Sequence, residues 1–509
     1  MELTTFAAEL ARSRPEEVAI RDERQALGWA EVDETLNRVA NGLLARDLGP
    51  AHRIAVFAEN AVETAMANLG GLVAGASVVP VNFHLTADEA AYILSDAEVR
   101  VLFVDSITAA RGLEAARQAG VPLVVGWGDV PTGVEPWSDW LAAQSAAEPP
   151  SDQPPRPNLL YTSGTTGRPK GTPLPPTMFA GGATVKEHLE NLGKSPMAAF
   201  GPHLVVGPMY HTGPLSGARL LAAGVSSVIL ARFDAEKTLD AIQRYGIGNS
   251  VMVPTHFVRM LALPDDVRAK YDTSSLQRIS HTGAKCPVDV KRAMIEWWGP
   301  VFVDAYGASE VGTTCMITSE EWLTHPGSVG RSVPPFEAMI LDDDGNPLPA
   351  GQEGRLFFKD ATGRGIVYHN APEKTAEAHI APGVFTLGEI AYMDAEGYVY
   401  ITDRFSDMVV SGGVNIYPAE AEQLLIHHPG VLDVACIGVP HTEMGEELKA
   451  LVIPRDAANP PSAAELIAWI RERLSTYKCP RTVEFVTDFG RNTMGKINKR
   501  KLRAPYWQS

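Results

Sequence analysis

The chain has 509 residues, which is too many for a single hydrophobic core, so two or more domains are expected. Apolar residues make up 45% of the sequence and charged residues 21%, as in ordinary globular proteins. The formal net charge of -17 argues against a general nucleic-acid-binding surface. A bound polyanion would have to be held by local lysines, arginines and backbone amides.

The cysteines and the hydropathy pattern exclude further classes of protein. Cys286, Cys315, Cys436 and Cys479 lie far apart and form no C-x-x-C pair, so neither a disulfide framework nor a zinc site is expected. Residues 1–14 lack the apolar core of a signal peptide, and no run of about 18 apolar residues occurs. We therefore expect a cytoplasmic protein that does not insert into membranes.

In the first part of the chain, short apolar strands alternate with helical patterns. Helical spacing covers residues 5–11, 29–48 and 63–74, and strand patterns cover residues 53–57, 78–81, 101–104 and 121–125. This alternation predicts an α/β fold with parallel sheets. Prolines between residues 149 and 157 then predict a stiff surface connection.

A segment rich in Ser, Thr and Gly follows residues 158–160, which we interpret as the end of a buried strand. The segment reads Tyr161, Thr162, Ser163, Gly164, Thr165, Thr166, Gly167, Arg168, Pro169, Lys170 and Gly171. Glycines let the backbone approach an anion, hydroxyls donate hydrogen bonds to phosphate oxygens, and Lys170 supplies a positive charge. The spacing does not fit a Walker A loop. We predict a phosphate-binding loop; the alternative is an ordinary surface loop.

An aromatic residue and a histidine end the next predicted strand. Pro208, Met209, Tyr210 and His211 follow the apolar residues 204–206. Such a pair could gate an apolar tunnel, although a single histidine is more often a satisfied core or surface residue.

Two more predicted strand ends carry polar residues. Residues 279–285 end in Gly283, Ala284 and Lys285, before a helical pattern over residues 288–298. A second strand leads into Asp304, Ala305, Tyr306, Gly307, Ala308, Ser309 and Glu310. This run places a ring that can stack, a close-approach glycine, a hydroxyl and a carboxylate next to one another. A lone glutamate at a strand end is usually solvated, so it is the cluster that indicates a site.

A polar segment over residues 403–407, with Arg404 and Ser406, is typical of a hinge between domains. Gly412 and Gly413 follow it, and alone they would indicate a plain hairpin turn. The remaining patterns predict a small α+β unit with helices over residues 419–427 and 463–474 and strands over residues 431–439, 448–453 and 482–486. Residues 490–496 fit G-x-x-x-x-G-K, but Ile497 stands where a Walker A loop needs Ser or Thr. The lysines around Lys496 could also form only a solvated basic surface.

Together these segments resemble the adenylate-forming superfamily, which holds acyl-CoA synthetases, aryl-CoA ligases, luciferases and the adenylation domains of peptide synthetases. The matching segments run from about residue 29 to residue 502. The resemblance implies an α/β protein with a large N-terminal domain, residues 1–404, of parallel and mixed sheets flanked by helices plus a β-barrel-like subdomain. Residues 405–509 would form a small, mobile α+β C-terminal domain.

The resemblance also implies roles for individual residues. The nucleotide would be bound by Thr162, Ser163, Gly164, Thr165, Thr166, Gly167, Lys170, Gly283, Ala284, Asp304, Ala305, Tyr306, Gly307, Ser309, Glu389, Arg404 and Lys496. Mg²⁺ would be bound by Thr162 and Glu310. The catalytic set would be Lys170, His211, Glu310 and Lys496, with His211 beside the acyl pocket. Gly412 and Gly413 would approach the thiol of coenzyme A.

The chain departs from the superfamily pattern at three places. Glu389 stands where the family has an aspartate that holds the ribose hydroxyls, and the extra methylene would shift its carboxylate by roughly 1 Å. Ser406 stands at a hinge position where Lys or Asp is commoner. The loop over residues 279–284 keeps only Gly283 and Ala284 of the family's Gly-Gly-Ala loop.

We therefore expect an acyl-CoA ligase that joins a bulky hydrophobic carboxylic acid to CoA through acyl-AMP, using Mg-ATP. Residues 296–300, 320–330 and 407–418 look most like bacterial ligases for fatty, steroid or bile acids. Because of Glu389, an enzyme that only converts preformed acyl-adenylate to acyl-CoA is a first alternative. A non-catalytic acyl-nucleotide-binding protein, or an enzyme that loads the pantetheine of a carrier protein, is a second. Homodimer formation stays open.

Overall fold

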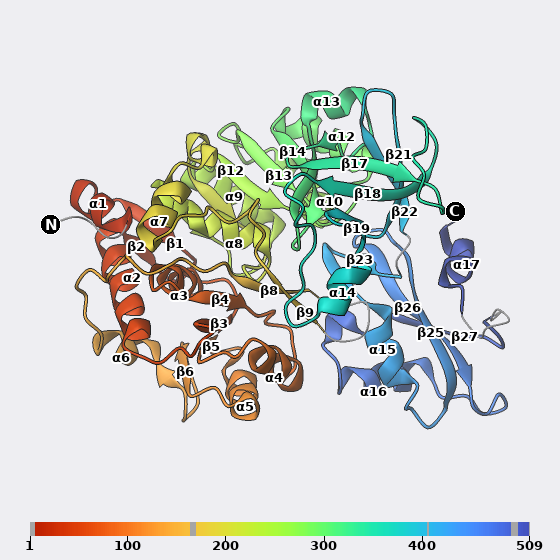
Figure 1. Ribbon diagram of the computed structural model, residues 1–509, viewed down its shortest axis with the longest axis horizontal. Helices are drawn as coiled ribbons and strands as arrows, with labels where there is room; N and C mark the ends of the chain where they lie inside the picture. The colour runs from red at the N-terminus through yellow and green to blue at the C-terminus, as the bar shows by residue number, and fades with distance from the viewer. Residues whose placement is uncertain (1–5, 163–168, 405–406, 490–496, 508–509) are drawn as a thin grey trace.

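The computed structural model in Figure 1 describes residues 6–162, 169–404, 407–489 and 497–507. It is an α/β protein with a large N-terminal domain and a small C-terminal domain, as the sequence predicts. Figure 1 shows the C-terminal domain, in blue, beside the N-terminal domain. In the described part of the chain, no helix is long and apolar enough to cross a membrane.

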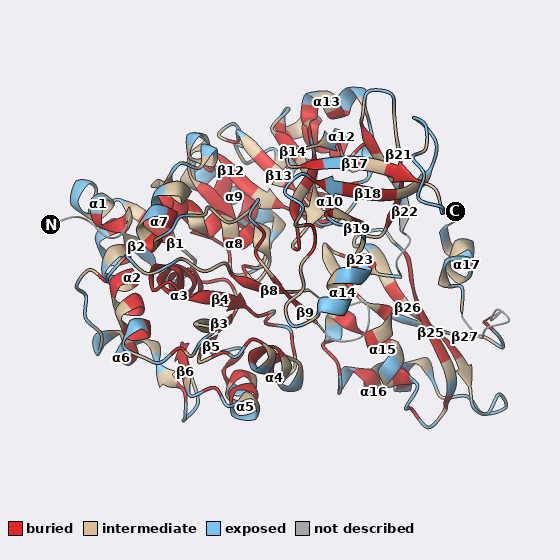
Figure 2. Ribbon diagram, viewed as in Figure 1, coloured by how far each residue is buried: buried red, intermediate tan, exposed pale blue. Residues whose placement is uncertain are grey.

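A parallel sheet with the strand order β4-β3-β5-β6-β7 forms near the N-terminus. Its strands are β3 (Arg53–Phe57), β4 (Ser77–Pro80), β5 (Val101–Asp105), β6 (Leu123–Trp127) and β7 (Glu135–Pro136). The helices connected with it are α2 (Trp29–Leu44), α3 (Val62–Val73), α4 (Ala87–Asp96), α5 (Ala109–Ala119) and α6 (Trp137–Ala142). Figure 2 shows α3 almost entirely in the colour of buried residues, because other elements cover it on several sides.

Strand β6 begins two residues later than the sequence predicts. Gly120 ends α5 with a φ of 70°, and the Val121 amide turns back to the Ala116 carbonyl at 2.8 Å. Val121 is therefore part of the helix cap and cannot join the sheet.

A larger mixed sheet has the order β16-β15-β14-β13-β12-β10-β11-β1-β2. Strands β14, β13, β12, β10, β11 and β1 are parallel along this path, and the remaining pairs are antiparallel. The strands are β1 (Val18–Arg21), β2 (Ala26–Gly28), β10 (His203–Val205), β11 (Ser227–Ile229), β12 (Asn249–Met252), β13 (Arg278–His281), β14 (Phe302–Ala308), β15 (Gly312–Thr318) and β16 (Arg331–Ser332). The helices of this region are α1 (Phe6–Ser13), α7 (Val185–Gly193), α8 (Thr212–Ala218), α9 (Ala235–Tyr245), α10 (Pro254–Leu261), α11 (Asp265–Arg268), α12 (Val288–Trp298) and α13 (Ser319–Thr324). The carboxyl ends of the parallel strands meet at one edge, where α/β proteins bind ligands.

An antiparallel sheet with the order β19-β20-β18-β21-β22, with β17 added beside β18, is the counterpart of the expected β-barrel-like subdomain. It contains β17 (Phe336–Leu341), β18 (Gly354–Asp360), β19 (His379–Ala381), β20 (Val384–Phe385), β21 (Glu389–Met393) and β22 (Val399–Arg404), with α14 (Pro372–Glu377) beside it. A separate ribbon pairs β8 (Leu159–Thr162) with β9 (Lys170–Pro173), so the two ends of the predicted phosphate loop are adjacent.

The C-terminal domain is built on the sheet order β24-β23-β26-β25, with β27 parallel to β26. Its elements are β23 (Val409–Ser411), β24 (Val414–Ile416), α15 (Pro418–Leu425), β25 (Val431–His441), β26 (Gly445–Pro454), α16 (Ala463–Arg471), the short helix η3 (Thr476–Lys478), β27 (Thr482–Phe485) and α17 (Lys499–Arg503). These elements confirm the α+β unit that the sequence predicts for the C-terminal region.

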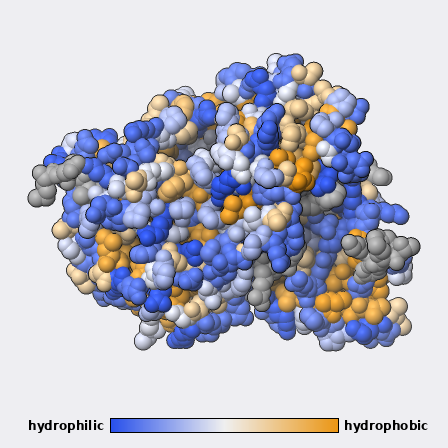
Figure 3. Space-filling model, viewed as in Figure 1, coloured by the Kyte–Doolittle hydropathy of each residue, from blue (hydrophilic) through white to orange (hydrophobic). Residues whose placement is uncertain are grey.

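The face of the molecule seen in Figure 3 is mostly hydrophilic, with hydrophobic residues in separate groups.

Candidate active site

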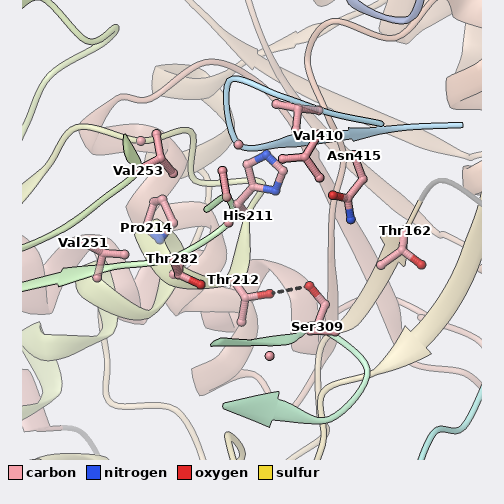
Figure 4. Close-up of a pocket in the computed structure, with 18 of the residues that line it drawn as sticks. Thr162, His211, Thr212, Pro214, Val251, Val253, Thr282, Ser309, Val410 and Asn415 are labelled. Atoms are coloured by element: carbon pink, nitrogen blue, oxygen red, sulfur yellow. Dashed lines mark hydrogen bonds between the residues drawn. The ribbon is translucent and has the colours of Figure 1, made fainter. Parts of the chain in front are cut away.

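A cavity of about 1060 Å³ lies where the N-terminal and C-terminal domains meet. Its walls come from the end of β8, from the carboxyl ends of the parallel strands, from β14 and from the β23–β24 hairpin. Figure 4 shows part of this wall, to which the hairpin contributes Val410 and Asn415 and the N-terminal domain contributes His211. The cavity therefore brings together segments that lie hundreds of residues apart in the sequence.

Thr162 and Glu310, the two predicted metal-binding residues, are hydrogen-bonded to each other. Thr162 ends β8, Glu310 follows β14, and the Thr162 hydroxyl donates to Oε1 of Glu310 at 3.0 Å. Burial raises the pKa of the Glu310 carboxyl, although the Thr162 hydrogen bond and the Lys170 charge act in the opposite direction. A nearby cation would therefore favour the ionised form of Glu310.

These oxygens fit Mg²⁺, which prefers a few carboxylate and hydroxyl ligands plus water and substrate phosphates. Within the described ranges, no cluster of three or more His, Cys, Asp or Glu residues is arranged to hold a metal ion. A magnesium ion at Thr162 and Glu310 would thus depend on phosphate oxygens and water for its other ligands.

Lys170 lies directly across the ribbon from Thr162, because these two residues are register partners in the β8–β9 pair. Its Nζ stands 5.2 Å from the centre of the Tyr368 ring. Burial and the nearby Lys374 charge lower the pKa of Lys170. The predicted loop residues between them, Ser163, Gly164, Thr165, Thr166 and Gly167, lie outside the described residues.

Strand β14 carries a row of predicted nucleotide-binding residues along the cavity wall: Asp304, Ala305, Tyr306, Gly307 and, just beyond its end, Ser309. The Asp304 carboxylate accepts a hydrogen bond from Nζ of the buried Lys291 at 3.2 Å. The Ser309 hydroxyl is 3.4 Å from that of Thr212, as the dashed line in Figure 4 marks. Gly307 has a further reason to be glycine, since a Cβ there would lie 2.0 Å from the Gly312 carbonyl oxygen of β15.

Tyr306 and Glu389 form a hydrogen bond that was not predicted from the sequence. The Tyr306 hydroxyl donates to Oε2 of the buried Glu389 at 2.7 Å. Glu389 begins β21 and is the register partner of Arg404 in β22. The two predicted ribose-binding positions are therefore adjacent in the sheet; the side chain of Arg404 lies outside the described residues.

His211 lies at the N-cap of α8, and its half-buried side chain lines the cavity. Burial, with a small contribution from His84, lowers the pKa of His211 to about 4. Its Nε2 atom has no hydrogen-bond partner in the described part of the chain. At neutral pH the ring is uncharged, and it packs against Tyr210 with the ring centres 4.4 Å apart.

Gly412 and Gly413 form the two-residue turn of the β23–β24 hairpin, with φ values of 59° and 81°. Both values are left-handed, as tight hairpin turns require. The turn also lines the cavity, and a Cβ on Gly283 would lie 3.5 Å from the Gly413 carbonyl oxygen. The segment is thus a hairpin turn, as one interpretation of the sequence has it, and it also lies at the cavity, which is compatible with the predicted approach to the thiol of coenzyme A. Ala284 lines the same cavity.

Several cavity residues were not predicted from the sequence. Phe233 and His256 stack at 4.1 Å with an angle of 7° between their rings, and burial lowers the pKa of His256 to about 3. Lys478 lines the cavity from the C-terminal domain and pairs with Glu89. No local pattern links residues so far apart, and an isolated lysine between Tyr477 and Cys479 is only a weak signal. The predicted Lys496 and the hinge residue Ser406 lie outside the described residues.

Comparison with known proteins decides the family. The model of the AMP-binding enzyme family matches residues 7–365, and that of the AMP-binding enzyme C-terminal domain matches residues 420–496. The chain belongs to the AMP-binding enzyme family. It is an adenylate-forming acid-thiol ligase of the acyl-CoA synthetase type, and enzymes of this type use ATP and CoA, generally with Mg²⁺.

The chain covers nearly the full length of its curated relatives. It is 32% identical to a feruloyl-CoA synthase of Amycolatopsis sp over 99% of both chains. It is 30% identical to the fatty acid--[acyl-carrier-protein] ligase ScoC of Streptomyces coeruleorubidus, over 98% of this chain and 95% of that protein. It is also 32% identical to a CoA ligase of Rhodococcus jostii, over 97% of this chain and 96% of that protein. That ligase is named for a propanoyl group attached to a methyl-dioxo-octahydroindene ring system.

The solved structures show the same fold. The amide bond synthetase McbA of Marinactinospora thermotolerans is 24% identical and superimposes with a TM-score of 0.83 over 99% of both chains. The o-succinylbenzoate CoA synthetase MenE of Bacillus subtilis, also 24% identical, superimposes at 0.80 as a double mutant bound to its product analogue OSB-NCoA, with 99% of both chains covered. The same enzyme with the acyl-adenylate OSB-AMP superimposes at 0.64, with 99% of this chain and 98% of that chain covered.

Proposed function

We propose that this enzyme joins a monocarboxylic acid with a bulky apolar body to CoA in two steps that share one cavity. The acid first attacks the α-phosphorus of ATP, which gives acyl-AMP and pyrophosphate. The CoA thiol then attacks the acyl carbon and releases AMP. The observation that carries this proposal is the Thr162–Glu310 pair, which faces a cavity whose other wall is the C-terminal hairpin.

The nucleotide would lie along β14, as the family resemblance implies. The loop from Thr162 to Lys170 would bind its phosphates, and Asp304, Ala305, Tyr306 and Gly307 would border its adenine together with Gly283 and Ala284. Glu389 and Arg404 would hold the ribose. Mg²⁺ at Thr162 and Glu310 would neutralise charge on the triphosphate while the carboxylate attacks. Ser309 would donate its hydroxyl to the α-phosphate.

The hydrogen bond from Tyr306 bears on the unusual glutamate at position 389. A carboxylate on a longer side chain is less well fixed, and the phenol holds Oε2 of Glu389 at 2.7 Å. This contact supports retention of the ATP-dependent step, because a fixed acceptor is what the ribose hydroxyls need. It disfavours the alternative of an enzyme restricted to preformed acyl-adenylate.

The acid would lie against the apolar wall near His211. The side chains there include Val251, Val253, Phe233 and His256, and the histidines are uncharged at neutral pH. Arg232 and Arg259, which also border the cavity, are paired with Glu59 and Glu443. These features favour an acid with an apolar body over a dicarboxylic acid, whose second carboxylate would need a cation.

We infer that residues 1–404 and 405–509 act as two bodies that rotate at Ser406 between the steps. Lys496 would reach the carboxylate and the α-phosphate for adenylation, and rotation would then bring Gly412 and Gly413 to the thiol. The higher TM-score with MenE bound to a product analogue than with MenE bound to acyl-adenylate supports the thioester-forming arrangement for this structure.

The acceptor thiol is that of CoA or of a carrier-protein pantetheine, since both carry the same arm. The likeness to ScoC supports keeping the second acceptor in the test. Fatty, aryl, steroid and terpenoid acids should be screened with ATP, with AMP and thioester measured separately, and with CoA and a loaded carrier protein supplied in parallel. We expect AMP and CoA thioester in equal amounts with an apolar acid. Thioester from supplied acyl-adenylate but never from acid and ATP would instead support the restricted enzyme.

Lys496 gives a second test of the same proposal. Lys496→Ala should suppress formation of acyl-AMP far more than formation of thioester from supplied acyl-AMP. Equal losses in both reactions would contradict the role assigned to Lys496.

A further inference from the structure

A buried lysine lies at the boundary between the two domains and forms hydrogen bonds with one carboxylate from each domain. Lys478 ends η3, and only 2% of its side chain is exposed. Its Nζ donates to Oε2 of Glu420 at 2.6 Å and to Oε1 of Glu89 at 2.8 Å. Glu420 is in α15 of the C-terminal domain, whereas Glu89 is in α4 of the N-terminal domain.

The surroundings of Glu89 favour the ionised form of its carboxyl group. It stands in the first turn of α4, where the helix dipole favours a negative charge, and it completes a capping box with Thr86. Its Oε2 also accepts a hydrogen bond from the Ser475 hydroxyl of the C-terminal domain at 2.5 Å. Burial alone would raise the pKa of Glu89, but the Lys478 charge and these hydrogen bonds more than offset it, so the pKa is lowered.

Rotation of the C-terminal domain would affect the two carboxylates differently. Lys478, Ser475 and Glu420 belong to the same domain and would move together, so their contacts would persist. Glu89 would stay behind, and both of its contacts across the boundary would break. The Glu89 contacts are therefore specific to the present arrangement of the domains.

These contacts also connect to the cavity. Helix α15 begins at Pro418, directly after β24, which ends at Ile416. Fixing Glu420 through Lys478 to Glu89 thus fixes α15 and the Gly412–Gly413 turn against Val253, whose Cγ1 would lie 3.0 Å from a Cβ on Gly413. The Glu89–Lys478–Glu420 contacts and the Gly412–Gly413 turn therefore belong to the same interface between the domains.

We propose that Glu89 is a positioning residue that selects the thioester-forming arrangement, by binding Lys478 and Ser475 of the C-terminal domain. This inference rests on the proposed function and adds to it the N-terminal residue that holds the domain in place. A buried ionic contact can select one arrangement of the domains, because its hydrogen bonds form in only one geometry. In other geometries the buried charges would lose their partners, which costs free energy.

The chain offers a matched control. Arg259 and Glu443 also form an ion pair between the domains, but their side chains are 44% and 43% exposed, and such surface pairs contribute little. Glu89→Gln and Glu443→Gln make the same chemical change at a buried and at an exposed contact. Glutamine can also take the place of glutamate in the capping box of α4.

The experiment measures the two half-reactions separately with the full chain. Pyrophosphate release from acid and ATP without CoA reports adenylation, and single-turnover conversion of supplied acyl-adenylate with CoA reports thioester formation. We expect Glu89→Gln to slow the second reaction by about tenfold, the ratio that one lost charge-assisted hydrogen bond produces, and to leave the first unchanged. Glu443→Gln should change both by less than about twofold.

Hydrogen exchange of the Lys478 and Cys479 amides, which close η3, supplies a readout that needs no catalysis. Glu89→Gln and the milder Ser475→Ala should both speed this exchange, and Glu443→Gln should not. If the wild-type enzyme makes no acyl-adenylate, the proposed function fails, while the exchange measurement still decides whether Glu89 holds the domain. Equal slowing of both half-reactions, or unchanged thioester formation and exchange in Glu89→Gln, would overturn the inference.

Discussion

The Thr162 hydroxyl donates a hydrogen bond to the Glu310 carboxylate at 3.0 Å, although 148 positions separate these residues in the chain. The ends of β8 and β14 meet here, beside Lys170 at the start of β9. A carboxylate and a hydroxyl on the wall of one cavity, with a lysine charge that acts on the carboxylate, form the kind of surface that receives a magnesium triphosphate.

Glu310→Gln should reduce acid-dependent pyrophosphate release by about 10²-fold, because the neutral amide cannot stabilise the metal ion and the charge that it neutralises. Glu396→Gln, in an exposed turn where 73% of the Glu396 side chain is accessible, is the control and should have no effect. The rates are measured over a range of Mg²⁺ concentrations. An unaltered magnesium dependence in Glu310→Gln would argue against a metal at this carboxylate.

Tyr306→Phe should raise the KM for ATP by about tenfold and change kcat little. The substitution keeps the ring but removes the hydrogen bond to Glu389, a charge-assisted bond that contributes about 1.5 kcal/mol or more. Steady-state pyrophosphate release with varied ATP measures both constants. Tyr392→Phe provides the comparison, since Tyr392 is in β21, the strand that Glu389 begins, and stacks on Tyr400. A KM identical to that of the wild type would mean that Glu389 needs no support from Tyr306 to bind the nucleotide.

Gly413→Ala should slow conversion of acyl-adenylate to thioester more than it slows adenylation. A Cβ at this position would lie 3.0 Å from Cγ1 of Val253, and the φ of 81° is strained for alanine. Gly397→Ala is a matched control, since Gly397 has a φ of 86° but its Cβ would meet only Arg331, at 3.9 Å. Both half-reactions are followed in single turnover. Similar effects of the two substitutions would show that strain alone, and not the contact with Val253, matters.

Stability should fall as the pH decreases from about 6.5 towards 4. Burial lowers the pKa of His203, His211 and His281 to about 4 and that of His256 to about 3, whereas unfolded histidines titrate near 6.5. The unfolded chain therefore binds more protons in this range, and stability that is fully present above pH 6.5 is lost at about 1.4 kcal/mol per pH unit for each histidine.

His256→Phe, which keeps a ring against Phe233, should reduce that slope by the contribution of one histidine. Urea unfolding at pH 7, 6 and 5 gives the free energies of unfolding. A slope in His256→Phe equal to that of the wild type would show that His256 binds protons equally in the folded and the unfolded protein, and would contradict the lowered pKa.

Much of the local structure could be predicted from the sequence, because hydrophobic periodicity is a local property. The strand over residues 53–57 has the predicted bounds, and the α+β order of the C-terminal domain is as predicted. The family and its motifs follow from short runs such as residues 304–310. Helix α2 ends at Leu44 rather than at residue 48, since the backbone turns at Ala45 before Gly49 and Pro50.

The contacts between distant segments could not be predicted in the same way. The Glu89–Lys478 pair joins residues 389 positions apart, and the Tyr306–Glu389 bond depends on how β14 meets β21. The uncharged state of His211 comes from burial by several elements, which no neighbouring residue reveals. Periodicity predicts which face of an element is buried, but the partner of that face is set by the tertiary fold.

The central claim is that the acid carboxylate attacks the α-phosphorus of ATP to form acyl-AMP before the thiol attacks. The most direct test supplies an accepted acid labelled with ¹⁸O in both carboxylate oxygens, together with ATP and CoA, and analyses AMP and pyrophosphate by mass spectrometry. The account predicts one ¹⁸O atom in each AMP and none in pyrophosphate. Unlabelled AMP, or label in pyrophosphate, would contradict it.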